Sequence, residues 1–533
     1  MLPLLPALLT AVQAVTPAAP GAILLDRSRI DRAPPPIVVK PAETRPATVD
    51  AAAPGVVIRG IRFTGAKAPA PVAVAARRFL GQRADGPTLS KLAAALSDAY
   101  GDSRVALYSI AIPAQTFDKG VVTVALTEGR IARAQVVSAD PLAHAQLKGR
   151  MGPLMTPGPL PRDRFERQFT LMRAVPGLTV HPDFADPEGT GALVLTVTPK
   201  QKKRRITGGF NNRGPSLLGD GQFDVRAEFY GVGVDGDQAT LAASAASNLQ
   251  RYRFASAGYL APVGSSGLTA SGSAAYLETR PRRTGIPGGI KGTAKQANAA
   301  LSYPLVRDFH RSVDVSLGID GVNSDNAAFG RVIADERSRA VRVSISAAEA
   351  RERRSGSASI AFSQGLDLLG ARVDAPLAQT GFTKANVAVA ASQAIGKRAA
   401  VRLSGSAQWT SDPLPAAERF AVGGEALGRA FDTALLTGDR GGGAVAELAY
   451  RPLASGRFAA SELYGFADAA QVTVLERGPL PGVQYSLGSA GVGVRARYRD
   501  KAELGLEAGW VTDRPFPGYT EDWRVSLGWR LSL

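Results

Sequence analysis

The last eleven residues of the chain, WRVSLGWRLSL, alternate between apolar and polar side chains without a break. Successive residues of a β-strand point to opposite faces, so this segment has two distinct faces if it is a strand. One face carries only large apolar residues: Trp523, Val525, Leu527, Trp529, Leu531 and Leu533. The other carries arginine, serine and glycine. This division is expected of a strand that has lipid on one side and water on the other.

The same alternation extends back to Ile206, in short segments such as FDVRAEF, VDVSLGID and AVRVSISA that are separated by Gly, Asp, Asn and Pro. No part of the chain reaches about 18 uninterrupted apolar residues, so we expect no membrane-spanning helix. An open sheet edge in hydrocarbon would leave backbone groups without hydrogen bonds, so the strands must close into a cylinder. Roughly 330 residues, at about 20 per strand and connection, predict an antiparallel transmembrane β-barrel of about 16 strands over residues 201–533.

A soluble β-solenoid is the alternative, but its strands would repeat at a fixed period, and we find none. The formal net charge of +17 allows nucleic acid, an anionic membrane surface or lipopolysaccharide as a partner. The Lys and Arg residues are dispersed through alternating segments rather than gathered in a recognition helix, which argues against nucleic acid. The basic run Lys200–Arg205 fits an interfacial collar where a soluble domain meets a membrane. The chain has no cysteine, which suits an oxidising compartment.

The N-terminal residues predict an export signal and a tether. Residues 1–14 form an apolar run that ends in small residues, although no Lys or Arg precedes it. Within residues 15–55, the segment Ala22–Arg32 fits a short amphipathic helix and Ala33–Gly55 a Pro-rich linker.

Two small α/β units follow, at residues 56–131 and 132–200. In each, an alternating strand is followed by two helical patterns and two further strands. This order predicts a three-stranded sheet covered by two helices, repeated in tandem.

A Gly-rich loop at Phe420–Gly443, FAVGGEALGRAFDTALLTGDRGGG, is too long for a tight turn and too rich in glycine for a helix. Arg429 lies near its centre, beside Phe431. Phe466 and Asp468 are two residues apart, so on a strand they share one face and could receive Arg429 as a charged pair.

Several motifs resemble known families. Pro113-Ala114-Gln115, Gly120-Val121-Val122 and Glu128-Gly129-Arg130-Ile131 are similar to the end of a POTRA (polypeptide-transport-associated) domain. Phe210–Gly214 resembles the first barrel strand of two-partner secretion transporters, and YGVGVDGDQATL from Tyr230 resembles their LGxGD hairpin. The loop resembles the signature of the same transporters, the TpsB or ShlB/FhaC/HecB family, through the following residues: Phe420, Gly423, Gly424, Arg429, Phe431, Gly438, Asp439 and Glu447.

The resemblance implies that the loop folds back into the barrel lumen, where Arg429 reaches Asp468 on a neighbouring strand. Glu447 either joins this contact or only faces the lumen. The N-terminal helix would act as a plug. This chain departs from the family at Ala430, where glycine is usual, and at Leu533, where the last residue is usually aromatic. The alanine is expected to be harmless unless that position needs a positive φ.

The function implied is export through the outer membrane. An unfolded partner exoprotein of the haemolysin or adhesin type would dock on the two POTRA domains in the periplasm and thread through the barrel. No cofactor, metal or catalytic residue is expected, and the sequence has no GxxxxGK[ST] phosphate loop. The alternatives are a barrel-assembly factor of the same superfamily, a passive porin and a plugged receptor. An outer-membrane hydrolase fits poorly, because the only histidines are His144, His181 and His310.

Overall fold

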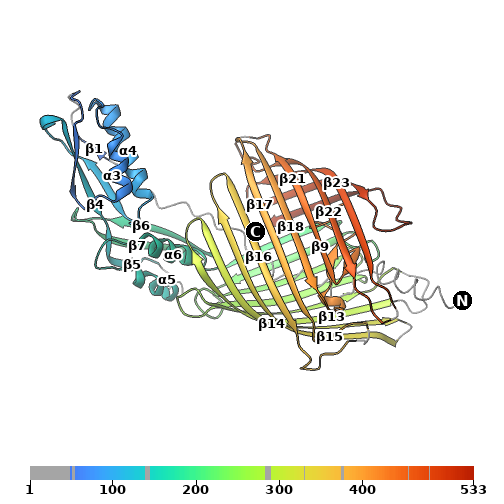
Figure 1. Ribbon diagram of the computed structural model, residues 1–533. Helices are drawn as coiled ribbons and strands as arrows, with labels where there is room; N and C mark the ends of the chain where they lie inside the picture. The colour runs from blue at the N-terminus through green and yellow to red at the C-terminus, as the bar shows by residue number, and fades with distance from the viewer. Residues whose placement is uncertain are drawn as a thin grey trace.

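The computed structural model describes residues 48–50, 55–138, 144–282, 290–328, 331–373, 377–453, 455–478 and 480–533. The expected signal segment, the N-terminal helix and most of the linker lie outside these residues. Figure 1 shows two small α/β modules in line at one end of a large slanted barrel. We call this the module end of the barrel and the opposite end the far end.

Sixteen strands of the described chain close into an antiparallel barrel, as the alternating pattern predicts. The last strand pairs with the first, with Gly528 opposite Asn211 and Ser532 opposite Thr207. The strands are β8 (Arg204–Asn211), β9 (Gln222–Tyr230), β10 (Gln238–Ala246), β11 (Tyr252–Pro262), β12 (Thr269–Thr279), β13 (Ile290–Arg307), β14 (Arg311–Ala328), β15 (Arg331–Ala350), β16 (Arg354–Gly365), β17 (Thr383–Ile395), β18 (Ala399–Thr410), β21 (Arg440–Tyr450), β22 (Glu462–Val474), β23 (Val483–Tyr498), β24 (Ala502–Asp513) and β25 (Trp523–Ser532).

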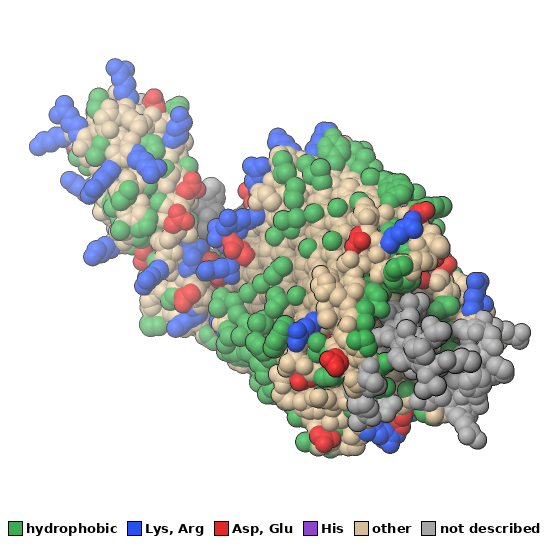
Figure 2. Space-filling model, turned by 45° about the vertical axis from the view of Figure 1, so that its right-hand side comes forward, with side chains coloured by type: hydrophobic (Ala, Val, Ile, Leu, Met, Phe, Trp, Pro, Cys, Tyr) green, Lys and Arg blue, Asp and Glu red, His purple; other side chains and the backbone are tan. Residues whose placement is uncertain are grey.

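The outer surface of the barrel is apolar. All six apolar residues of the C-terminal segment are exposed on it, from Trp529 at 39% to Leu533 at 89%. Their polar neighbours point inward, and Ser526 is buried. Hydrophobic side chains gather in broad fields over the barrel wall in Figure 2, whereas Lys and Arg are frequent on the modules. The expected lipid-facing dyad is therefore confirmed. No helix among the described residues is long and apolar enough to cross a bilayer.

The first module contains β1 (Thr48–Val49), β2 (Gly60–Gly65), α3 (Ala70–Arg77), α4 (Gly86–Gly101), β3 (Tyr108–Ile112), the 3-10 turn Asp118–Gly120 and β4 (Val121–Glu128). Its sheet has the order β1-β3-β4-β2, so the predicted β-α-α-β-β unit is present with one unpredicted short strand, β1, beside β3. The helix α4 begins at a side-chain cap, because Asp85 accepts the N–H of Thr88 at 2.8 Å. It buries Leu89, Leu92 and Leu96 against the sheet.

The second module repeats this order with β5 (Arg130–Val136), α5 (His144–Met151), the 3-10 turn Gly152–Leu154, α6 (Arg162–Arg173), β6 (Leu178–Ala185) and β7 (Ala192–Gln201), in a sheet of order β5-β7-β6. Arg162 joins it to the first module, donating to the carbonyl oxygens of Ser103 and Val105, both at 2.9 Å.

The second module is docked on the module end of the barrel. The turn between β13 and β14 inserts Phe309 into the module's core, where its ring lies edge-on to Phe165 at 5.9 Å. Phe309 is 4% exposed. On α6, Arg167 donates to the carbonyl oxygens of Pro304 at 3.0 Å and Leu305 at 3.3 Å. The barrel therefore completes the core of the second module.

Candidate functional site

The chain between β18 and β21 turns back into the barrel at the far end. It contains the 3-10 turn Ala416–Glu418 and the short antiparallel strands β19 (Phe420–Val422) and β20 (Leu436–Gly438). The wall strand β21 begins at Arg440, so the last four residues of the predicted loop 420–443 belong to the barrel wall. We call residues 411–439 the inner loop and residues 423–435 its tip.

Glycines give the tip its compact shape. Gly423 has a φ of +103°, and a Cβ there would lie 2.3 Å from the carbonyl oxygen of Asp432. Its N–H donates to the carbonyl of Leu427 at 2.9 Å, and its own carbonyl accepts the N–H of Ala434 at 3.1 Å. Any side chain at this position would open the tip.

The Asp468 side chain holds the tip through main-chain N–H groups of the tip. The carboxylate accepts the N–H of Gly428 and the N–H of Arg429, each at 3.1 Å, and the hydroxyl of Ser489 at 2.7 Å. The predicted pairing of the Arg429 guanidinium with Asp468 is therefore wrong, although the two residues do meet. The carboxylate is already occupied by two main-chain donors of a tight turn, and the long Arg429 side chain extends past it.

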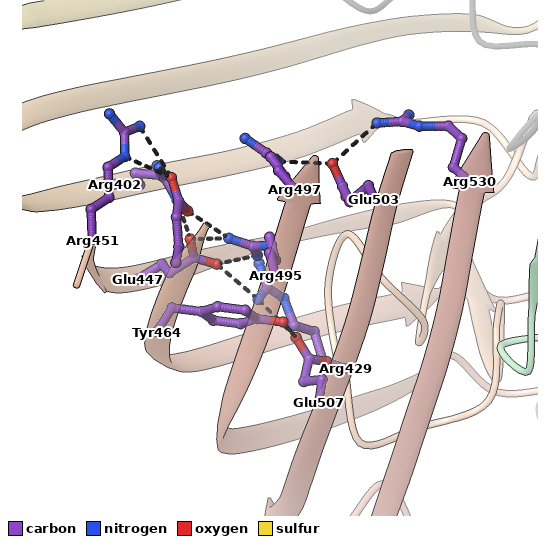
Figure 3. A network of polar contacts seen from close by, with 11 residues as sticks. Arg402, Arg429, Glu447, Arg451, Tyr464, Arg495, Arg497, Glu503, Glu507 and Arg530 are labelled. Atoms are coloured by element: carbon purple, nitrogen blue, oxygen red, sulfur yellow. Dashed lines mark hydrogen bonds and ion pairs between the residues drawn. The ribbon is translucent and has the colours of Figure 1, made fainter. Parts of the chain in front are cut away.

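The guanidinium of Arg429 reaches two other carboxylates. It donates to Glu447 at 3.1 Å and to Glu507 at 3.2 Å, and it lies over the ring of Phe466 at 4.6 Å. Figure 3 shows these side chains converging from the tip, β21 and β24. Tyr464 donates its hydroxyl to Glu507 at 2.8 Å. Glu447, for which sequence reasoning left two roles open, belongs to this network.

The network continues along the inner wall (Figure 3). Arg402 bonds both Glu447 and Glu462 at 2.7 Å, and Arg495 bonds Glu447 at 2.8 Å while lying over the Tyr464 ring at 3.7 Å. Glu447 and Glu462 each bond more than one guanidinium, and these charged partners compensate for the removal of each carboxylate from water.

A second attachment holds the base of the inner loop on the opposite wall. Glu418 has a fully buried side chain and pairs with Arg342 on β15 and Lys384 on β17, each at 2.8 Å. Arg342 also pairs with Asp320 on β14 at 2.7 Å. Sequence reasoning missed this cluster. The available signal in the sequence was one charged residue at an inward-facing position in each of the alternating strands β14, β15 and β17.

The Gly438-Asp439 motif ties the inner loop to the far rim. Asp439 accepts the N–H groups of Leu414 and Leu475, each at 2.8 Å, and pairs with Arg477 at 2.5 Å. Arg477 is 1% exposed. A Cβ on Gly438 would lie 2.8 Å from the carbonyl oxygen of Thr473, so this position must stay small.

The tip also spans the seam between the first and last strands. Asp432 pairs with Arg524 on β25 and accepts the hydroxyl of Ser216, which follows β8, at 2.6 Å. Phe431 is 1% exposed and packs against Tyr519 at 5.5 Å between ring centres. The aromatic motif residues are therefore packing groups, and Phe420 is buried in the same apolar cluster.

Ala430 fits its site without strain. It is fully buried and is not among the residues with positive φ. Its methyl group lies beside Gly509 of β24, where a Cβ would be 3.4 Å from that of Ala430. The departure from the family's usual glycine is accommodated by this wall glycine.

The tip separates two cavities in the lumen, of 610 and 580 Å³. Glu425, Ala426, Leu427 and Arg429 line both. Charged side chains bound both cavities, such as Arg495 in the first and Arg342 in the second, and the second also has a wall rich in serine, alanine and glycine. Within the part of the chain that the structure describes, no three His, Asp or Glu residues are grouped as a metal site.

The comparisons agree with this architecture. A sequence model of the haemolysin secretion/activation protein family ShlB/FhaC/HecB matches residues 189–496. CdiB from Escherichia coli has a similar structure, with a TM-score of 0.68 and 18% identity, over 96% of this chain and 97% of that one. CdiB from Acinetobacter baumannii gives a TM-score of 0.62 and 17% identity, over 96% of each chain.

BamA from Haemophilus ducreyi, in a structure lacking POTRA domains 1–3, gives a TM-score of 0.56 and 13% identity, over 90% of this chain and 99% of that one. No curated protein matches in sequence. The family match covers more than half of the chain, and the closed sixteen-stranded barrel is the architecture of an outer-membrane protein. This chain is an outer-membrane β-barrel protein and belongs to the ShlB/FhaC/HecB family of two-partner secretion transporters.

Proposed function

We propose that this protein exports one partner exoprotein, unfolded, through its barrel lumen to the cell surface. The observation that carries the proposal is the inner loop, which divides the lumen between two cavities and is held on both walls. A chain crossing the lumen must displace this loop. The loop is therefore the element whose attachment controls passage.

The two modules would act as POTRA domains in the periplasm and capture the partner. Each presents a small sheet with a strand at its edge, β2 in the first module and β6 in the second. An extended polypeptide can add to such an edge through main-chain hydrogen bonds, which give affinity without a fixed sequence. Because the second module is docked on the barrel through Phe309, a chain captured by it would lie close to the barrel entrance.

The attachments of the loop are suited to reversible release. Arg429 and Glu418 are held by ion pairs with lumen side chains and not by covalent bonds. The polar lumen cavities can solvate these charged groups when the pairs separate. No nucleotide is needed in this scheme. Folding of the exported chain outside the cell would give transport its direction, because a folded chain cannot return.

The other parts of the proposal concern residues 1–55 and the surroundings of the barrel. Residues 1–14 would be removed as an export signal, and the Ala22–Arg32 helix would plug the resting pore. The outer wall would contact outer-membrane lipid and lipopolysaccharide. The exported partner would be a haemolysin or an adhesin.

A barrel-assembly factor is the second candidate, favoured by the structural likeness to BamA. An assembly factor acts on many barrels, whereas a two-partner transporter acts on one exoprotein. Deleting the gene in its native host and comparing the surface and secreted proteins separates them. The proposal predicts that one large exoprotein disappears and returns on complementation, while other outer-membrane barrels keep their levels. A general loss of barrels, with no single exoprotein missing, would favour assembly instead.

A further inference from the structure

The apolar belt of the barrel ends abruptly at the far end of strands β13–β15. On the module-end side of this boundary the outward residues are large, apolar and exposed, as in Leu301, Leu317, Ile319 and Val343. On the far-end side the outward residues are polar or cationic. We call Arg253, Tyr276, Lys295, Arg337 and Arg339 the rim patch.

The register brings these residues into neighbouring rows. Lys295 of β13 lies opposite Tyr276 of β12 and Asn323 of β14, and Asn323 lies opposite Arg337 of β15. Neighbouring strands are about 4.8 Å apart, so the backbones of Lys295 and Arg337 are separated by about 10 Å. Side chains of this length can converge on one group placed between them.

Three cations of the rim patch have no carboxylate partner among the described residues. Arg253 donates to the carbonyl of Leu249, Arg339 donates to the carbonyl of Ser338 at 2.7 Å, and the exposed Lys295 bonds none of the described residues. Of the outward acids nearby, Glu278 and Asp335 are already occupied, and the third, Asp325, lies opposite Asp335, so cations still outnumber acids on this face. Glu278 pairs with Arg280 and Lys291, and Asp335 pairs with Arg337 and Arg372.

A glycine keeps one of these cations at the belt boundary. Gly321 lies opposite Arg339, and a Cβ at Gly321 would come within 3.0 Å of the Arg339 Cδ and 3.3 Å of its Nε. The arginine stem therefore lies across the neighbouring strand at Gly321. Its guanidinium stays at the level where a lipid headgroup would be.

The patch is confined to one side of the barrel. At the far end of β18 and β25 the outward residues are aromatic, with Trp409 at 60% and Trp523 at 63% exposure. Arg440 of β21 is stacked on the Trp409 ring at 5.6 Å. A general preference for cations above the belt would not produce this asymmetry.

We propose that the rim patch binds the phosphate groups of a phosphorylated glycolipid of the outer leaflet, that is, the lipid A part of lipopolysaccharide. Three cations without a carboxylate partner, together with Arg337 and an interfacial tyrosine, suit a phosphorylated headgroup whose acyl chains lie on Leu317, Ile319 and Val343. The assignment of leaflet rests on the proposed function, which places the modules in the periplasm.

The test uses the purified full chain in nanodiscs. Thermal unfolding is measured in phosphatidylethanolamine alone and with added lipid A, either doubly phosphorylated or dephosphorylated. Binding is measured for the wild type and for the triple variant Lys295→Gln, Arg337→Gln, Arg339→Gln. Arg440→Gln is the matched control, since it removes an outward cation at the same end. Inorganic phosphate serves as a separate probe for a simple anion site.

The wild type and Arg440→Gln should bind phosphorylated lipid A, and the triple variant should bind it at least tenfold more weakly. Equal binding by the triple variant would overturn the proposal. So would equal binding of dephosphorylated lipid A, which would indicate acyl contacts alone, or an equal effect of inorganic phosphate, which would indicate a free-anion site. None of these results depends on export, so failure here leaves the proposed transport role untouched.

Discussion

The Asp468 carboxylate accepts the main-chain N–H of Arg429 at 3.1 Å, whereas the guanidinium of Arg429 bonds Glu447 and Glu507. The two residues are therefore partners without being an ion pair. This arrangement separates two roles that a simple salt bridge would combine, because Asp468 fixes the fold of the tip and the Arg429 side chain fixes its position against the wall.

The first prediction is that exchanging the two charges does not restore function. Arg429→Ala should leave a folded barrel but lower export at least tenfold, because a charged hydrogen bond of this kind contributes about 1.5–3 kcal/mol. The double variant Arg429→Asp, Asp468→Arg should be as defective as either single variant. Export is followed by immunoblot of the exoprotein identified by gene deletion, and folding by heat-modifiability on gels. Recovery in the double variant would show that the side chains do pair.

The second prediction concerns the base of the inner loop. Glu418→Gln should lower the thermal stability of the purified barrel by about 3 kcal/mol or more, because it leaves Arg342 and Lys384 with less compensating charge. Glu425→Gln is the control, since Glu425 is an exposed residue of the same loop. Equal melting curves for the two variants would mean that the Glu418 cluster does not hold the loop.

The third prediction addresses the joint between module and barrel. Phe309→Ala should weaken docking by about 3 kcal/mol, because it removes a buried ring from the core of the second module. Hydrogen exchange in α6 should rise, while exchange in the barrel strands is unchanged. Leu305→Ala, at an exposed position nearby, should have little effect. Unaltered exchange in α6 for Phe309→Ala would refute the docking role.

The fourth prediction is a dependence of stability on pH at the same joint. Burial raises the pKa of the Glu166 carboxyl above its usual range, although the N–H of Phe309 and the nearby Arg162 oppose the shift. A carboxyl with a raised pKa binds more protons in the folded state, so its contribution to stability falls as pH rises above about 4.5. Glu166→Gln should therefore unfold near the wild-type temperature at pH 4 and above it at pH 8. The exposed Glu188→Gln should show no such divergence. A gap between wild type and Glu166→Gln that narrows with rising pH would contradict the assignment.

The fold was largely predictable because lipid imposes a strict rule on each strand. Alternation alone located the barrel and its outward face, as Trp523 and Leu533 show. The short strand β1 was missed, because two residues carry too little pattern to be recognised.

The site was predictable only in outline. The motif found Arg429 and Asp468, and strand periodicity correctly placed Phe466 and Asp468 on one inner face. The choice between Asp468, Glu447 and Glu507 as partner of the guanidinium depends on how the tip turns, which no local pattern encodes. The Glu418 cluster joins residues about 100 positions apart, and only closure of the barrel brings them together.

The most direct test of the account is a disulfide that locks the tip to the wall. The native chain has no cysteine, so two introduced thiols can pair only with each other within one molecule. Ala430→Cys with Gly509→Cys places two Cβ atoms 3.4 Å apart, close to the usual disulfide spacing of about 3.8 Å. The control pair, Gly405→Cys with Ala444→Cys, has a Cβ spacing of 3.7 Å between neighbouring wall strands.

Export of the exoprotein is then measured with each pair oxidised and reduced. The oxidised variant with cysteines at positions 430 and 509 should export almost nothing, reduction should restore its export, and the control pair should export normally in both states. Normal export by the oxidised locked variant would contradict the claim that the inner loop must leave its wall for a chain to pass.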